Sequence, residues 1–233
     1  MFSTSKILSV VLLVLSPAAA EQIEMKTVDE RVLEFGDVVR QRLAPSFAAA
    51  GVPYPPARIA LLAIKQRRVL EVYAAGPDET MSFVCRYPIL AASGSLGPKL
   101  REGDRQVPEG VYQLRELNPN SLFHLSLWID YPNAFDLAHA AAEGRTEPGS
   151  EIMIHGGAES RGCVAVGDTA AEDLFVLAAV TGVPNVRIIL TPVDFRIQTA
   201  PVDLPAEAPR WTPELYEILR LELSSYRSPR QTR

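Results

Sequence analysis

The segment IHGGAESRGC, residues 154–163, has His155 near its start and Cys163 at its end, among three glycines and a serine. A cysteine nucleophile needs a neighbouring base or positive charge to form its thiolate, and backbone N–H groups that point at the oxyanion. His155 ends a predicted strand and is the candidate base, while Gly162 permits a tight turn before the cysteine. Arg161 adds positive charge nearby. The segment therefore predicts a nucleophile and its base held by a glycine-rich loop.

Each of the three histidines also has a structural interpretation. His155 fits a half-buried polar residue at a strand end, although its position near a glycine-flanked cysteine favours the catalytic role. His124 lies among apolar residues of a predicted strand, which fits either a buried core histidine or the wall of a pocket. His139 lies in an alanine-rich segment and is expected in an exposed loop or a short helix.

The sequence contains two cysteines, Cys85 and Cys163, and their pairing decides whether the second can react. In an oxidising compartment, two cysteines commonly form a disulfide, which would remove the nucleophile. The alternative is a free, reactive Cys163, with Cys85 as a small hydrophobic residue within a strand. Both alternatives are open at this stage.

Residues 1–20 have the pattern of a secretory signal peptide. Lys6 precedes an apolar run over 7–15, and three alanines precede Glu21, so cleavage is expected after Ala20. The run is far shorter than the roughly 20 residues of a spanning helix, and no cysteine follows the cleavage site. We therefore expect an exported chain with neither a transmembrane anchor nor a lipid anchor.

The composition is that of a globular protein, since 47% of the 233 residues are hydrophobic and 22% are charged. Such a chain is long enough for one substantial domain with its own hydrophobic core. The charge balance is 23 Lys and Arg against 28 Asp and Glu. It gives no reason to expect nucleic acid or an anionic membrane surface as a partner.

Spacing argues against several other kinds of site. Papain-like peptidases place the cysteine before the histidine, but no histidine follows Cys163. The sequence has no Gly-x-Ser-x-Gly elbow and no Cys-x-x-Cys pair. His155, Cys163 and Asp168 are zinc-ligand types without the paired close spacing of structural zinc sites, so no metal is predicted. Asp168 is expected to stabilise the start of the next helix.

Helical and strand patterns divide the chain into a strand-rich centre and helical ends. A helix is expected over 28–43, with Pro45 ending or kinking it. A second helix is expected to start with a capping box of Thr169 and Glu172. A third helix, over 213–226, is expected to be capped by Thr212 and to share one apolar face, formed by Leu215, Ile218, Leu219 and Tyr226. Strands are expected as a hairpin over 57–75 with a turn at 65–68, and within 82–93, 110–117, 121–129, 150–157 and 185–193.

Three blocks in consecutive order resemble the L,D-transpeptidase (YkuD-type) catalytic domain family, in its YafK-like branch. They are the Gly-Pro-Lys…Gly-Asp…Pro-Glu-Gly block within 87–114, the Asn-Pro-Asn-Ser…Phe-His-Leu-Ser block within 117–136, and the His-Gly…Ser-x-Gly-Cys block within 152–168. The expected domains are a signal peptide at 1–20, a helical segment and linker at 21–56, the catalytic domain at 57–195, and a proline-rich linker and helix at 196–233.

The resemblance implies a mostly β fold with flanking helices, in which the catalytic domain is β-sandwich-like. It also implies a periplasmic enzyme without metal or organic cofactor, acting on the peptide stems of peptidoglycan in cell-wall biogenesis and cell shape. Cys163 would attack the carbonyl at the L-centre of a diamino acid and displace the terminal D-alanine, with His155 as base. The Gly156 carbonyl would orient the imidazole, and N–H groups around Gly162 and Cys163 would hold the oxyanion.

Three further residues, His124, Ser160 and Arg161, are candidate substrate contacts. Arg161 stands where commoner members of the family have a second histidine, and Ala165 and Val166 replace an Arg-Met pair. The branch also includes hydrolases, so release of a wall-attached lipoprotein or of a D-amino acid is an alternative to transfer. A catalytically inactive wall-binding module is the alternative from another class. The terminal helices are expected to pack on the core or to bind a partner.

Overall fold

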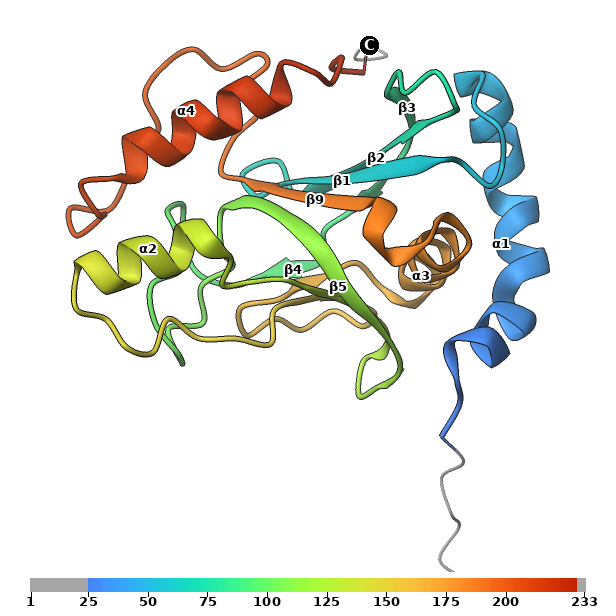
Figure 1. Cartoon of the computed structure of the whole chain (residues 1–233), viewed down its shortest axis with the longest axis horizontal. Helices are drawn as coiled ribbons and strands as arrows, with labels where there is room; N and C mark the ends of the chain where they lie inside the picture. The colour runs from blue at the N-terminus through green and yellow to red at the C-terminus, as the bar shows by residue number, and fades with distance from the viewer. Residues whose placement is uncertain (1–24, 230–233) are drawn as a thin grey trace, which may run out of the picture.

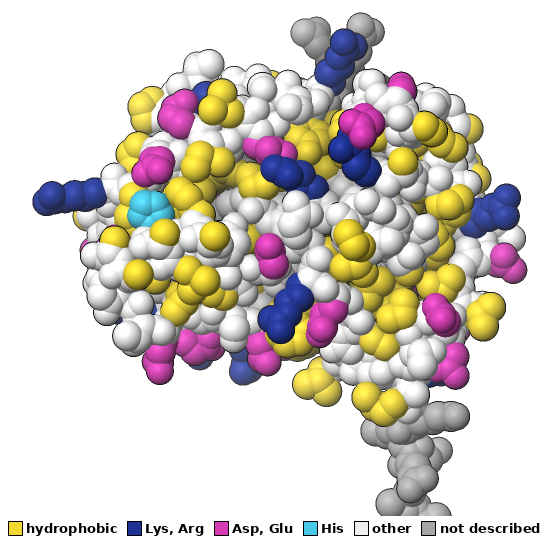
Figure 2. All heavy atoms as spheres, viewed as in Figure 1, with side chains coloured by type: hydrophobic (Ala, Val, Ile, Leu, Met, Phe, Trp, Pro, Cys, Tyr) yellow, Lys and Arg dark blue, Asp and Glu magenta, His cyan; other side chains and the backbone are white. Residues whose placement is uncertain are grey.

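A computed structural model of the chain describes residues 25–229 (Figure 1). The signal peptide predicted for residues 1–20 lies outside this range. No helix within 25–229 combines the length and the apolar character needed to cross a membrane. On the face seen in Figure 2, acidic and basic side chains are interspersed, so neither sign of charge dominates it.

One hydrogen-bonded sheet, with the strand order β3-β2-β1-β9-β5-β6-β7-β8-β4, forms the centre of the described part. Its strands are β1 (Arg58–Ile64), β2 (Val69–Ala75), β3 (Ser82–Pro88), β4 (Ala91–Ala92), β5 (Gly110–Ser121), β6 (His124–Ile129), β7 (Met153–His155), β8 (Val164–Ala165) and β9 (Val186–Thr191). The helices are α1 (Val28–Ala50), α2 (Ala134–Ala142), α3 (Asp168–Thr181) and α4 (Thr212–Leu223), with a 3-10 turn η1 (Val183–Asn185).

The long strand β5 belongs to both halves of the sheet. Its first residues, from Gly110, pair with β9, and its later residues, from Leu114, pair with β6 (Figure 1). The main hydrophobic core joins side chains of both halves, such as Leu61 of β1 with Leu127 of β6 and Ile154 of β7. The prediction of a mostly β fold with flanking helices is confirmed, and the two halves pack on each other through this core.

The hairpin predicted over 57–75 is confirmed, because β1 and β2 pair antiparallel from Ile64 and Val69 at the turn. β1 is apolar from Ile59 onward, and β2 is apolar except for the buried Glu71, since each of their faces is covered. One face contributes Leu61 and Val72 to the core shared with α1 and α3. The other face contributes Leu62 to a second core beneath α4. The two terminal helices are therefore packed on the sheet from opposite sides.

Helix α1 differs from the prediction at its end. A capping box of Thr27 and Glu30 starts it, and it runs through Pro45 to Ala50 before Gly51 ends it at φ 70°. A proline inside a helix costs one backbone hydrogen bond. The extra turns bury Phe47 in the core, which offsets that cost.

The starts of α3 and α4 also differ from the prediction. The Thr169–Glu172 capping box does not form, and Gly167 is the N-cap residue without a side-chain cap. Glu172 instead pairs with Arg42 of α1, so its carboxylate serves a tertiary contact. Thr212 is the first residue of α4 rather than its cap, and its hydroxyl donates to the Pro209 carbonyl.

Helix α4 provides a test of how strongly the C-terminal segment is held. Of the four residues predicted to share one apolar face, Leu215, Leu219 and Tyr226 are buried, whereas Ile218 is 39% exposed. We expect Leu219→Ala to lower the free energy of unfolding by about 2–5 kcal/mol, and Ile218→Ala to change it by about 0.5 kcal/mol. Urea unfolding of both variants measures this. Equal losses in the two variants would contradict this placement of the helix.

Candidate active site

The pairing of β7 with β8 brings His155 and Cys163 together. The two strands are parallel, with His155 opposite Ala165. Cys163 directly precedes β8, two positions before Ala165, so it is a diagonal neighbour of His155 across the strand pair. Residues 156–163 alone connect the strands. The predicted glycine-rich loop therefore lies between the two candidate catalytic residues.

The environment of His155 favours the neutral form of its imidazole. Its ring is buried, and Nδ1 lies 2.6 Å from the Gly156 carbonyl oxygen, to which it donates. The Nδ1 proton leaves Nε2 as the free lone pair of the neutral ring. Phe123 stacks on the imidazole at 4.5 Å between ring centroids. Burial lowers the pKa of His155 below its ordinary 6.5, although the Gly156 hydrogen bond opposes this shift.

Cys163 is a partly exposed thiol in its neutral form. Burial raises its pKa, while the backbone at Met153 and the charge of Lys99 oppose that shift. The thiol donates to the Glu151 carbonyl oxygen at 3.6 Å. Within residues 25–229, no hydrogen bond joins the thiol to His155. Catalytic hydrogen bonds are often long in unliganded enzymes and tighten when substrate binds.

The start of the loop is fixed by Gly156 and Asp168. A Cβ atom at Gly156 would lie 2.5 Å from Asp168 Oδ1 and 2.6 Å from the Phe123 carbonyl oxygen, so only glycine fits. The same Asp168 Oδ1 accepts the Gly157 N–H at 2.8 Å. Asp168 opens α3, as the sequence indicated, but its carboxylate also fastens the loop to that helix. No local pattern in the sequence predicts this contact.

The end of the loop is fixed by Ser160 and Ser93. The Ser160 hydroxyl donates to the Cys163 carbonyl at 2.6 Å and accepts the Ser93 N–H at 2.9 Å. The Gly162 N–H donates to Ser93 Oγ at 2.7 Å. The groups predicted to touch substrate or oxyanion at Ser160 and Gly162 are thus already bonded within the protein. Ser93 was not predicted as a site residue.

His124, the first residue of β6, lies beside the loop rather than in the core. Its side chain is 27% exposed, and Nε2 lies 3.2 Å from Glu172 of α3. The ring also meets Phe35 of α1 edge to face, at 5.5 Å between centroids. Glu172 in turn accepts a hydrogen bond from Arg42 of α1 at 2.9 Å. His124 therefore links the turn that carries Phe123 to both helices.

The remaining predicted residues lie outside these contacts. Arg161 is exposed to solvent. Cys85 lies in β3, where burial raises its pKa to about 11, and both cysteines are free, so the disulfide alternative is not realised. His139 lies in the short helix α2 and stacks on Trp211 at 4.4 Å. Across 25–229, no three His, Cys, Asp or Glu side chains are arranged to hold a metal ion.

Left-handed backbone conformations gather around the loop. Among residues 25–229, five non-glycine residues have positive φ, and three of them lie near the loop. Glu151 accepts a hydrogen bond from Cys163, and Arg105 and His124 lie within 4.0 Å of where a Cβ atom would stand at Gly162 and Gly156. Such conformations cost about 1–3 kcal/mol each and concentrate at functional sites. The region around Cys163 therefore has the backbone strain that is typical of a site under functional constraint.

The chain is similar to proteins of one known family. The sequence model of the YkuD family, the L,D-transpeptidase catalytic domain, matches residues 58–190. The candidate L,D-transpeptidase YafK of Escherichia coli K12 is 36% identical over 141 residues, which is 58% of this chain and 54% of that protein. The chain thus spans about half the length of the curated relatives that it matches.

Solved structures with related folds include the helical cell shape determining protein Pgp2 of Campylobacter jejuni. It is 26% identical, with a TM-score of 0.45, and the match covers 57% of this chain and 47% of that one. L,D-transpeptidase 1 of Mycobacterium tuberculosis is 14% identical, with a TM-score of 0.33, over 57% of this chain and 62% of that one.

The protonation states can be tested by alkylation with iodoacetamide. We expect Cys163 to react before Cys85, and its rate to rise with pH through a midpoint above about 8.5, the ordinary thiol value, because burial disfavours the thiolate. Peptide mapping by mass spectrometry from about pH 6 to about pH 11 measures both rates. A midpoint below about 7 would contradict the neutral pair and indicate a preformed thiolate and imidazolium.

Proposed function

The chain belongs to the L,D-transpeptidase catalytic domain family, and from this membership we propose that it is a cysteine acyltransferase acting on the peptide stems of peptidoglycan. The observation that carries the proposal is the parallel register that makes His155 and Cys163 diagonal neighbours. We further propose that the protein is exported to the periplasm, in line with the signal peptide pattern of residues 1–20.

The reaction proceeds in two steps through a thioester. Cys163 Sγ attacks the carbonyl carbon at the L-centre of the diamino acid, while His155 Nε2 takes the thiol proton. The tetrahedral intermediate collapses, and the nitrogen of the terminal D-alanine leaves with the proton from His155. An amine of another stem or of a protein lysine then attacks the thioester carbonyl and releases the cysteine.

Two neutral partners suit this mechanism. A histidine whose pKa lies below 6.5 is unprotonated at neutral pH, so it accepts a proton rather than donating one. The Gly156 carbonyl holds Nδ1–H and stabilises the positive charge that forms on the ring during attack. Phe123 covers the ring and limits the access of water.

In this proposal, the backbone N–H of Cys163 donates the hydrogen bond that stabilises the oxyanion. The neighbouring Gly162 N–H already donates to Ser93 Oγ, so it is a weaker candidate for this role. Exposed Arg161 is the residue best placed by charge to meet a carboxylate of the stem. We assign Ser160 to the support of the loop rather than to substrate, because its hydroxyl holds the Cys163 carbonyl.

Hydrolysis is the second candidate, because water can resolve the same thioester. The products would then be a shortened stem, or a lipoprotein released from the wall, instead of a cross-link. A wall-binding module without turnover is the candidate from another class. The matched segment is about half the length of the relatives, so we propose only the chemical class of the acceptor, which is a primary amine.

Product analysis with purified tetrapeptide muropeptides separates these candidates. We expect loss of the terminal D-alanine with formation of a cross-linked dimer, detected by mass spectrometry. Cys163→Ala should lower the turnover by about 10³-fold or more, because no other thiol lies in the loop. Cleavage confined to lipoprotein-linked stems would move the assignment to the hydrolase. Binding without turnover in either assay would favour the binding module.

The dependence on pH tests His155 as the base. We expect kcat/KM to fall on the acidic side with a midpoint below about 6.5, because burial lowers the pKa of His155 and protonation removes its lone pair. Initial rates across pH measure this. His155→Gln should abolish the activity, and with it the acidic fall of the pH–rate profile. An acidic midpoint above about 6.5 would show that another group controls the rate.

A further inference from the structure

We propose that Ser93 is a positioning residue that holds the Gly162–Cys163 peptide in the orientation needed to bind the oxyanion. The inference rests on the proposed cysteine chemistry. It starts from the antiparallel pairing of β4 with β8, in which Ala92 lies opposite Val164. Ser93, the residue that directly follows β4, therefore lies beside Cys163, although the two are far apart in the sequence.

Ser93 forms hydrogen bonds with two residues of the turn that ends in Cys163, Gly162 and Ser160. Its hydroxyl oxygen accepts the Gly162 N–H at 2.7 Å, and its own backbone N–H donates to Ser160 Oγ at 2.9 Å. Ser160 then donates its hydroxyl proton to the Cys163 carbonyl at 2.6 Å. The peptide groups on either side of the Gly162–Cys163 peptide are thus held from Ser93, the first directly and the second through Ser160.

The hydroxyl oxygens of Ser93 and Ser160 lie 3.0 Å apart, where either could donate to the other. Each also lies 2.6 Å from a carbonyl oxygen, which can only accept, so we assign the protons to these shorter contacts. Ser93 Oγ donates to the Arg105 carbonyl at 2.6 Å, and each hydroxyl has a single proton. Ser93 Oγ is therefore free to act only as an acceptor toward Gly162. The same holds for Ser160, whose proton is used by the Cys163 carbonyl. Each group in the network therefore has one role, as donor or as acceptor, and these roles orient the peptide groups that take part.

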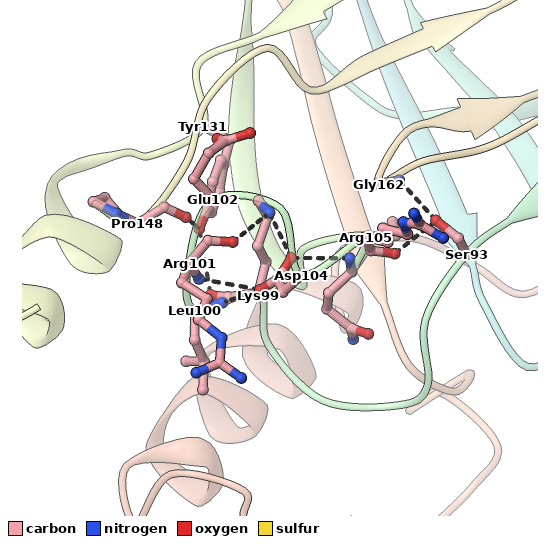
Figure 3. A network of polar contacts seen from close by, with 12 residues as sticks. Ser93, Lys99, Leu100, Arg101, Glu102, Asp104, Arg105, Tyr131, Pro148 and Gly162 are labelled. Atoms are coloured by element: carbon pink, nitrogen blue, oxygen red, sulfur yellow. Dashed lines mark hydrogen bonds and ion pairs between the residues drawn. The ribbon is translucent and has the colours of Figure 1, made fainter.

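The Arg105 carbonyl is itself held in place by a buried ion pair (Figure 3). Lys99, 5% exposed, donates to Asp104 Oδ1 at 2.6 Å. Asp104 also accepts the backbone N–H groups of Leu100, Arg101 and Gln106. This closed loop presents the Arg105 carbonyl, at a residue with φ 55°, to Ser93. A rigid support therefore stands behind the hydroxyl that holds Gly162.

Gly162 needs such a support because its backbone is free to rotate. Its φ of 102° lies in the region that glycine alone visits readily. Without the bond to Ser93, the peptide between Gly162 and Cys163 has no side-chain restraint at its first residue. An oxyanion donor works only when it points at the developing charge, at about 2.7–3.1 Å. Loss of the restraint should reduce the stabilisation of the transition state more than it reduces the binding of substrate.

The test compares Ser93→Ala with Ser95→Ala in the mature full chain. Ser95 is an exposed serine of the same segment, and its hydroxyl reaches only the Leu96 carbonyl, at 3.3 Å. We expect Ser93→Ala to lower kcat by about 10–100-fold with KM changed less than about threefold, and Ser95→Ala to behave as wild type. Ser93→Thr, which restores the hydroxyl, should recover most of the rate.

A second readout separates orientation from thiol reactivity. Alkylation by iodoacetamide forms no oxyanion, so Ser93→Ala should keep the rate and the pH midpoint of Cys163 alkylation. The proposal is overturned if Ser93→Ala retains wild-type kcat, or if alkylation falls in parallel with turnover. If Ser93→Ala does not fold, Ser160→Ala is measured in the same way. It removes the bond to the Cys163 carbonyl and the acceptor of the Ser93 N–H, and we again expect kcat to fall while the alkylation rate of Cys163 is kept.

The two levels of the proposal fail differently. Undiminished turnover by Cys163→Ala would overturn the cysteine mechanism itself, and with it the role given to Ser93. If Cys163→Ala has no turnover while Ser93→Ala turns over at the wild-type rate, only the positioning role of Ser93 is overturned.

Discussion

The parallel pairing of β7 and β8 over a short connection is the constraint on which the site depends. Parallel neighbours usually need a crossover of about a dozen residues or more, often a helix, whereas here residues 156–163 suffice. Glycines with positive φ, Gly157 and Gly162, let the chain reverse twice within that length. The short return keeps His155 and Cys163, the proposed base and nucleophile, next to each other across the pair of strands.

Such a loop is held from outside as well as by its own glycines. Asp168 fastens its start to α3, and Ser93, directly after β4, fastens its end. A further chain of contacts runs from Arg42 of α1 through Glu172 to His124, next to the aromatic ring that covers His155. The N-terminal helix, which lies before the residues matched by the family, thereby supports the catalytic loop.

Local patterns in the sequence predicted the hairpin, the strand order along the chain and the histidine–cysteine pair, because each depends on residues near one another. Ser93 and Asp168 contact the loop through strand register and helix placement, which no local pattern encodes. Pro45 was expected to interrupt α1, but the buried Phe47 outweighs its local preference. Gly162 was predicted from its flexibility, yet only the pairing of β4 with β8 reveals that its N–H is occupied.

The central claim is that Cys163 carries the acyl group during turnover. Mixing the enzyme with a tetrapeptide stem and quenching in acid, followed by intact mass and peptide mapping, tests it directly. We predict an adduct equal to the stem minus D-alanine, on the peptide that contains Cys163, labile to hydroxylamine as a thioester should be. The adduct should be absent from Cys163→Ala. An adduct on another residue, or normal turnover by that variant, would contradict the mechanism.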